Sequence, residues 1–209
     1  MQTALKILLA VVILICGYSL WPRTPGFTTF RPDTLARSDV RAWEALGRKQ
    51  WSAYTWNNYW VLDQQFQFQP LVSFRMARNY TRAASILVNA TNGEEQQKAL
   101  PFFKHYFELA NAAMKGEMNT DAMAKRELDI WIMTSTKSAN SISLTMLSSE
   151  QWASFAGGKP REYRDAAAKL VEGALMYGTA GTTSSQRVEK TLTDGYTKLL
   201  DATSPQAKK

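Results

Sequence analysis

The chain has 209 residues, a formal net charge of +7, 45% hydrophobic residues and 21% charged residues. This composition is typical of a folded globular protein and excludes a chain that is disordered throughout. A single cysteine and a single histidine exclude internal disulfides and any metal site built from several histidines. The positive charge suits nucleic acid, anionic lipid or an acidic protein surface.

The N-terminal segment, residues 1–22, has the composition of a membrane anchor, which argues against nucleic acid as a partner. No charged residue occurs from position 7 to position 21. A helix of that length rises about 22 Å, and a snorkelling lysine before it brings the span closer to the hydrocarbon core of about 30 Å. Aromatic side chains at its far end suit the opposite interface. The residues that define this predicted anchor are Lys6, Ile7, Leu14, Tyr18 and Trp21.

Two alternatives would remove or replace the anchor. A secretory signal would be cleaved after small residues, and the best match, Gly17-Tyr18-Ser19, is weak. A lipoprotein signal would place lipid on Cys16, but the bulky Ile15 precedes it. We therefore expect a retained single-pass anchor in the bacterial inner membrane. Its short N-terminal tail favours a helical domain on the periplasmic side, although the flanking positive charges are nearly balanced.

Prolines and glycines divide the rest of the chain. Residues 23–32 read as an extended linker, 33–202 as one helical domain and 203–209 as a flexible tail. No strand-type alternation persists, so the fold class is all-α. We expect helices at 33–46 with Asp33 as N-cap, in the first part of 51–68, at 70–89, and at 94–115 with a break or a fresh helix start at Pro101. Further helices are expected from 119 or 120 past 132, at 160–178 and from 184 or 185 onward. The polar segment 137–155 has no clear assignment.

Two stretches could form a partner surface. Residues 51–68 are rich in aromatic side chains, and a buried core is the simplest interpretation. A partner surface, a pigment-bearing surface or a membrane interface is the alternative. Three arginines share one face of the helix at 70–89 and indicate either a solvated face or a docking site for acidic partners or lipid head groups. We predict that Phe74 lies on the inner face of that helix with Ala77 and Ala84. The candidate partner surface comprises Trp51, Trp56, Trp60, Arg75, Arg78 and Arg82.

No catalytic motif occurs. His105 is interpreted as a helix histidine, and Gly157-Gly158-Lys159 lacks the earlier glycine and the hydroxyl residue of a phosphate-binding loop. Carboxylates such as Glu127 and Asp129 are interpreted as helix-surface charges. We predict no catalytic, cofactor or metal site and therefore not an enzyme. An enzyme that relies on His105 and Glu108 is the minor alternative.

Local patterns between residues 33 and 178 resemble an uncharacterised group of short bacterial proteins that have one N-terminal anchor and a small helical domain. The patterns are those of residues 35–45, Arg78 with Arg82, residues 127–131 and residues 174–178. The resemblance implies a fold and a topology without an activity. We expect a non-catalytic accessory subunit of a larger integral membrane protein complex in the lipid bilayer, for example a bioenergetic one such as a photosynthetic reaction-centre or antenna assembly. The alternative is a periplasmic domain that binds a small ligand or an envelope polymer through its aromatic cluster.

Overall fold

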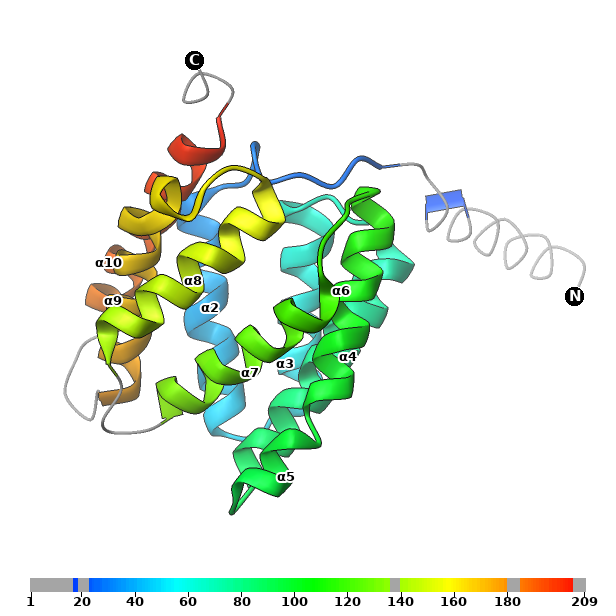
Figure 1. The fold of residues 1–209 in the computed structure, drawn as a ribbon, viewed down its shortest axis with the longest axis vertical. Helices are drawn as coiled ribbons and strands as arrows, with labels where there is room; N and C mark the ends of the chain where they lie inside the picture. Colours follow the sequence, from blue (N-terminus) through cyan, green and yellow to red (C-terminus); the bar gives the residue numbers. More distant parts are fainter. Residues whose placement is uncertain (1–16, 19–22, 136–139, 180–184, 205–209) are drawn as a thin grey trace, which may run out of the picture.

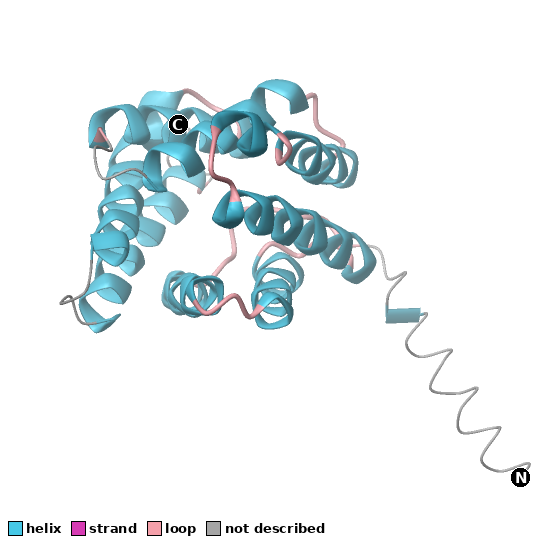
Figure 2. Ribbon diagram, turned by 90° about the horizontal axis from the view of Figure 1, so that it is seen from below, coloured by secondary structure: helices cyan, strands magenta, loops and turns pink. Residues whose placement is uncertain are grey.

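A computed structural model describes residues 17–18, 23–135, 140–179 and 185–204, and its regular elements there are helices (Figure 1). Figure 2 shows the same helices from below, joined by loops, with no strand in these ranges. The all-α prediction is confirmed. The elements are α2 (Pro32–Gly47), α3 (Trp51–Trp60), the π-helical turn η1 (Val61–Gln65), α4 (Pro70–Asn89), α5 (Gly93–Gln97), α6 (Leu100–Met114), α7 (Thr120–Ser135), α8 (Ser141–Ala156), the 3-10 turn η2 (Pro160–Tyr163), α9 (Arg164–Thr179) and α10 (Ser185–Thr203).

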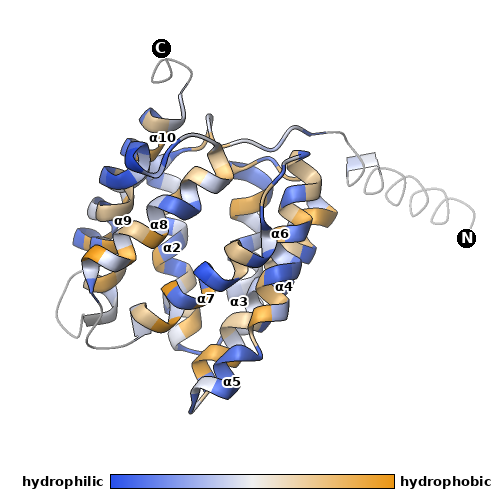
Figure 3. Ribbon diagram, viewed as in Figure 1, coloured by the Kyte–Doolittle hydropathy of each residue, from blue (hydrophilic) through white to orange (hydrophobic). Residues whose placement is uncertain are grey.

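The long helices form a closed ring. Each one packs on the next in chain order, the short α5 excepted, and α10 returns to pack on α2. In Figure 1, α9 and α10 lie at one side of the molecule and α4 and α6 at the other. Each of the long helices carries both hydrophobic and hydrophilic residues (Figure 3). Closure of the ring gives most helices two packed neighbours, and the buried residues of these contacts form the core.

Helix starts follow the predicted signals with local differences. Pro32, Pro70 and Pro101 lie in first turns, where the missing backbone N–H costs nothing. Asp33 is inside α2, not its N-cap, because Pro32 already belongs to the helix. The segment without a clear assignment contains α8, whose N-cap Asn140 accepts a hydrogen bond of 3.0 Å from the backbone N–H of Ile142.

Two glycines allow α9 and α10 to approach each other closely. A Cβ atom added at Gly173 would lie 2.6 Å from Cδ2 of Leu192. A Cβ atom added at Gly195 would lie 2.9 Å from Cδ2 of Leu170. Each helix therefore inserts a leucine into the space that a glycine leaves on the other helix.

The segment predicted as a linker contributes to the core. Phe27 and Phe30 are 6% and 3% exposed, and the Phe27 ring centroid lies 4.9 Å from that of Phe66. The Thr203 hydroxyl donates a 2.7 Å hydrogen bond to the Phe27 carbonyl. Thr203, the first residue of the predicted tail, is buried at the end of α10, whereas residues 205–209 lie outside the described ranges. The chain before α2 is thus bound to the domain.

The prediction for Phe74 is wrong, because this side chain is 47% exposed. Helix α4 packs between α3 and α6, so its buried residues face two directions: Ala83 packs with residues of α6 and α7, and Ala84 packs with residues of α2 and α3. Phe74 is on the remaining, outward side.

The predicted anchor lies almost entirely outside the described residues, which include only Gly17 and Tyr18 of it. Within the ranges that the structure describes, no helix is both long and apolar enough to cross a bilayer. Lys6, Ile7, Leu14 and Trp21 lie outside those ranges, so their assignment to an anchor stays a prediction.

Candidate functional site

The aromatic cluster is divided between the core and the surface. In α3, Tyr54 is 3% exposed, whereas Trp56 and Trp60 are 62% and 46% exposed. Trp51 is partly buried at the start of the helix. The Gln-rich end of the stretch forms η1, which is followed by the buried Phe66 and Phe68. The core interpretation therefore holds for part of the cluster, and Trp56 and Trp60 need a different explanation.

Exposed side chains also lie on α4, which packs on α3. Leu71 and Phe74 are 56% and 47% exposed, and the three arginines of the predicted stripe are also exposed. A 2.9 Å hydrogen bond from the Thr55 hydroxyl to the Thr81 hydroxyl holds α3 against α4. Arg82 differs from the other arginines because its guanidinium lies 5.7 Å from the ring centroid of Phe102 on α6. We name the following residues the α3–α4 surface: Trp56, Trp60, Leu71, Phe74, Arg75 and Arg78.

An ion pair connects the chain that follows the apolar segment to η1, directly after α3. The Arg23 guanidinium donates a 2.7 Å hydrogen bond to Oδ1 of Asp63, whose side chain is only 2% exposed. The Tyr18 hydroxyl donates to Oδ2 of the same carboxylate at 3.2 Å. The backbone N–H of Gly26 donates to the Phe66 carbonyl at 3.1 Å. The N-terminal segment therefore enters the domain directly beyond Trp60.

A second polar group lies inside the ring, around Glu127 on α7. Its carboxylate accepts hydrogen bonds of 2.6 Å from the Tyr80 hydroxyl on α4 and 2.6 Å from the Gln151 amide on α8. The Trp131 indole N–H donates to the Tyr80 hydroxyl at 3.1 Å. Burial raises the pKa of Glu127, against the effect of these donors. The interpretation of Glu127 as a surface charge is wrong; Asp129 is exposed as expected.

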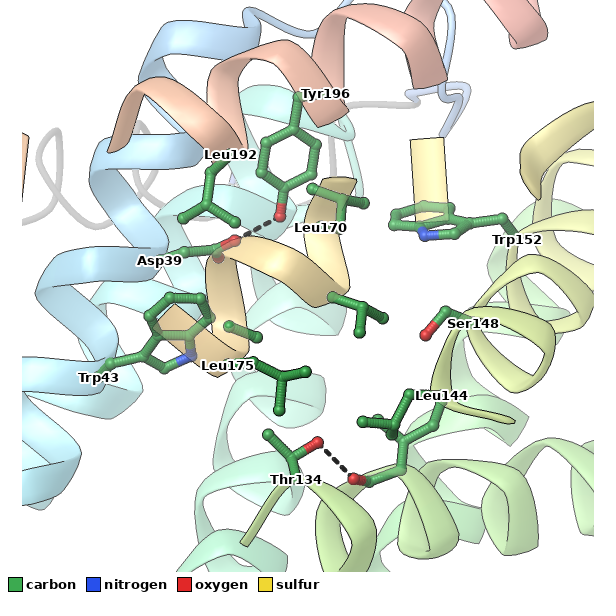
Figure 4. A pocket seen from close by; sticks show the side chains of 13 residues that line it. Asp39, Trp43, Thr134, Leu144, Ser148, Trp152, Leu170, Leu175, Leu192 and Tyr196 are labelled. Atoms are coloured by element: carbon green, nitrogen blue, oxygen red, sulfur yellow. Dashed lines mark hydrogen bonds between the residues drawn. The ribbon is translucent and has the colours of Figure 1, made fainter. Parts of the chain in front are cut away.

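A cavity of about 170 Å³ lies between α2, α7, α8, α9 and α10 (Figure 4). Thirteen residues line it, and Asp39 and Tyr196 are the titratable ones among them. The Tyr196 hydroxyl donates a hydrogen bond to Oδ2 of Asp39. Burial raises the pKa of Asp39 to about 6, although this hydrogen bond acts in the opposite direction. The cavity thus combines apolar walls with one acidic group.

Sequence reasoning missed both Asp39 and Glu127. Glu127 shares a helical face with Ala124 and Trp131, and this spacing was a signal that its side chain turns inward. Tyr196, the hydrogen-bond partner of Asp39, is 157 positions away in the sequence, and no local pattern predicts this contact. The predicted tryptophans Trp51, Trp56 and Trp60 line neither this cavity nor the shallower one between α8 and α9.

His105 lies on α6 with its Nδ1 atom 3.2 Å from Oε2 of Glu108, and both side chains are close to half exposed. The pair is an i, i+3 contact on the helix surface. No group of three or more potential metal ligands occurs in the described part of the chain. That the protein is not an enzyme stays a prediction.

The chain matches no protein-family model, and no curated protein or solved structure is significantly similar to it. The resemblance to short anchored bacterial proteins over residues 33–178 therefore stays a prediction, and functional conclusions depend on the geometry of the chain itself.

Proposed function

We propose that this protein is a non-catalytic, single-pass accessory subunit of a larger bacterial membrane protein complex, with its helical domain on the periplasmic side. The observation that carries the proposal is the position of the α3–α4 surface beside the point where the N-terminal segment enters the domain. Asp63, which binds Arg23 and Tyr18, follows Trp60 by one turn of helix. An apolar segment at this point would bring the surface close to the bilayer and to proteins embedded in it.

The chemistry of the α3–α4 surface suits a protein partner. Tryptophan and arginine dominate the binding energy of many interfaces, because they combine large apolar area with directional polar contacts. Four large hydrophobic side chains of this surface are close to half exposed or more. Exposure of these side chains to water lowers solubility and adds nothing to the core, whereas a partner would cover them. Bioenergetic complexes, photosynthetic reaction-centre assemblies among them, are the first partners to test.

Mild-detergent extraction followed by native gel analysis and affinity copurification tests the proposal. We expect the full chain to migrate in a large complex, and Trp56→Ala with Trp60→Ala to weaken that association at least tenfold. Ile142→Ala with Met146→Ala is the matched control, since these apolar side chains are exposed on α8. A solitary monomer under every extraction condition would contradict the proposal, and so would equal losses in both double variants.

A further inference from the structure

The cavity around Asp39 has a composition that core packing alone does not explain. Five helices border a space of about 170 Å³ that is partly open to solvent. An apolar cavity of roughly 150 Å³ is large enough to hold a benzene molecule. The space is therefore large enough for a small organic molecule.

The acidic group in this cavity has no cationic partner among the residues that the structure describes. Within those residues Asp39 makes no ion pair, and its single hydrogen bond comes from the Tyr196 hydroxyl. Its other oxygen, Oδ1, accepts no hydrogen bond from the described part of the chain and is not among the buried, unpartnered atoms, so it remains accessible. A carboxylate in apolar surroundings destabilises the folded state unless hydrogen-bond donors or a positive charge compensate it. Oδ1 of Asp39 is thus a free hydrogen-bond acceptor, and no positive charge of the described residues balances the charge of the carboxylate.

Aromatic and apolar side chains surround this free acceptor. Trp43 lies one helical turn after Asp39 on α2, and both side chains line the cavity. Trp152 on α8 lines it too, and the aliphatic side chains include Leu144, Leu170 and Leu175 (Figure 4). An indole face attracts cations through the ring quadrupole, and the aliphatic walls favour a hydrocarbon group. Carboxylate, indole and apolar walls together are the features that recognise an organic ammonium ion.

We propose that this cavity is a binding site for a small organic ammonium ion, such as a monocyclic or short-chain primary amine. The ammonium group donates a hydrogen bond to Oδ1 of Asp39 and lies against Trp43, and the hydrocarbon part occupies the space toward Trp152. Tyr196 holds the carboxylate in place from the other oxygen and acts as a positioning residue. This site lies apart from the α3–α4 surface and does not depend on the proposed subunit function.

Benzylamine and benzyl alcohol test the site, because they have similar shapes and differ in charge. The full chain in mild detergent is titrated with each compound at pH 7.5, by calorimetry and by thermal unfolding. We expect saturable benzylammonium binding with a Kd on the order of 0.1–1 mM, as befits so few ligand atoms. Benzyl alcohol should bind at least tenfold more weakly.

Three variants connect that difference to the cavity. Asp39→Asn should remove the preference for the amine, and Ala174→Phe should abolish binding of both compounds by filling the space. Asp165→Asn, an exposed acid on α9, is the matched control and should change nothing. Circular dichroism establishes that each variant is folded, and Ala174→Phe keeps the test decisive if Asp39→Asn does not fold.

Acidification supplies an independent measurement. Asp39 and Tyr196 are the titratable groups that line the cavity, and burial raises the Tyr196 pKa far above neutrality. Benzylammonium affinity should therefore fall severalfold from pH 7.5 to pH 5 as Asp39 becomes protonated. Absence of saturable binding, equal affinity for amine and alcohol, or an unchanged preference in Asp39→Asn would overturn the proposal.

Discussion

Two carboxyl groups lie inside the ring of helices and differ in how their oxygens are used. Glu127 has both oxygens occupied by donors from α4 and α8, and aromatic rings pack around it. Asp39, which lines a cavity, has one oxygen occupied and receives no hydrogen bond on the other from the described residues. Burial raises the pKa of both groups.

The difference separates a structural acid from a binding acid. A carboxylate whose donors all come from the protein holds helices together, and its burial cost is offset within the folded chain. A carboxylate that keeps a free acceptor beside an empty space leaves that cost partly uncompensated. Such an arrangement lowers stability in the free protein, and a ligand of opposite charge restores it.

The largest effect is expected for Glu127→Ala. This change leaves the Tyr80 hydroxyl and the Gln151 amide without an acceptor and opens a cavity at the junction of α4, α7 and α8. We expect a loss of about 3–5 kcal/mol in the free energy of unfolding. Urea unfolding of the full chain in mild detergent measures it.

Glu127→Gln is the matched control for that loss. Gln151 has a buried Oε1 atom without a hydrogen-bond partner among the described residues, so a rotated Gln151 amide can accept from the new amide group. We expect a cost of only about 1 kcal/mol. Equal losses in the two variants would show that the hydrogen bonds of Glu127 contribute little.

Asp39→Asn should raise the free energy of unfolding at high pH, whereas Glu127→Ala lowers it. The Asp39 pKa is about 6 in the folded chain against an ordinary 3.8, so ionisation opposes folding. The protonated group therefore costs no stability below pH 3.8, and the folded state loses stability as the pH rises from 3.8 through 6. Removing the charge should stabilise the free protein by up to about 3 kcal/mol at pH 8 and by almost nothing at pH 3.5.

Thermal unfolding of Asp39→Asn at several pH values checks this expectation, with Asp165→Asn as the control on an exposed acid. A variant that is less stable than the parent at pH 8 would place Asp39 in the same structural class as Glu127.

Gly173→Ala should disturb the Asp39 cavity and leave the Glu127 group intact. The added methyl group would meet Leu192, which lines the cavity, at 2.6 Å. We expect a loss of about 2 kcal/mol from overpacking, together with weaker benzylammonium binding. Gly178→Ala has no atom within 4 Å of the added Cβ and should be neutral or slightly stabilising. The unfolding midpoints of both variants, compared with that of the parent protein, test this expectation.

Arg23→Ala should produce the smallest of these changes and adds a third acid to the comparison. Asp63 is buried and ion-paired, and the substitution leaves it with the Tyr18 hydroxyl and the Gln64 amide as partners. We expect a loss of about 1–2 kcal/mol and faster hydrogen exchange in residues 23–31. Unchanged exchange there would mean that burial of Phe27 and Phe30 and the other hydrogen bonds of the segment hold it without the ion pair.

Helix positions could be predicted because their signals are local. Proline in a first turn and asparagine at an N-cap act within four residues, so Pro70 and Pro101 marked α4 and α6 correctly. Which residues are buried was harder to predict from the sequence. A helix with two packed neighbours, such as α4, buries more than one face, so the apolar stripe does not identify Phe74 as an outward residue. The Asp39–Tyr196 contact depends on closure of the ring between α2 and α10, and no periodicity reports it.

The most direct test is a carbon-detected NMR titration of the side-chain carboxyl groups, with and without benzylamine. The comparison of the two acids predicts that Asp39 titrates near pH 6 in the free protein and at lower pH when the amine is bound, because a nearby cation favours the carboxylate. The Glu127 signal should not respond to the amine. An Asp39 signal that titrates near its ordinary value of 3.8 and ignores the amine would contradict the account.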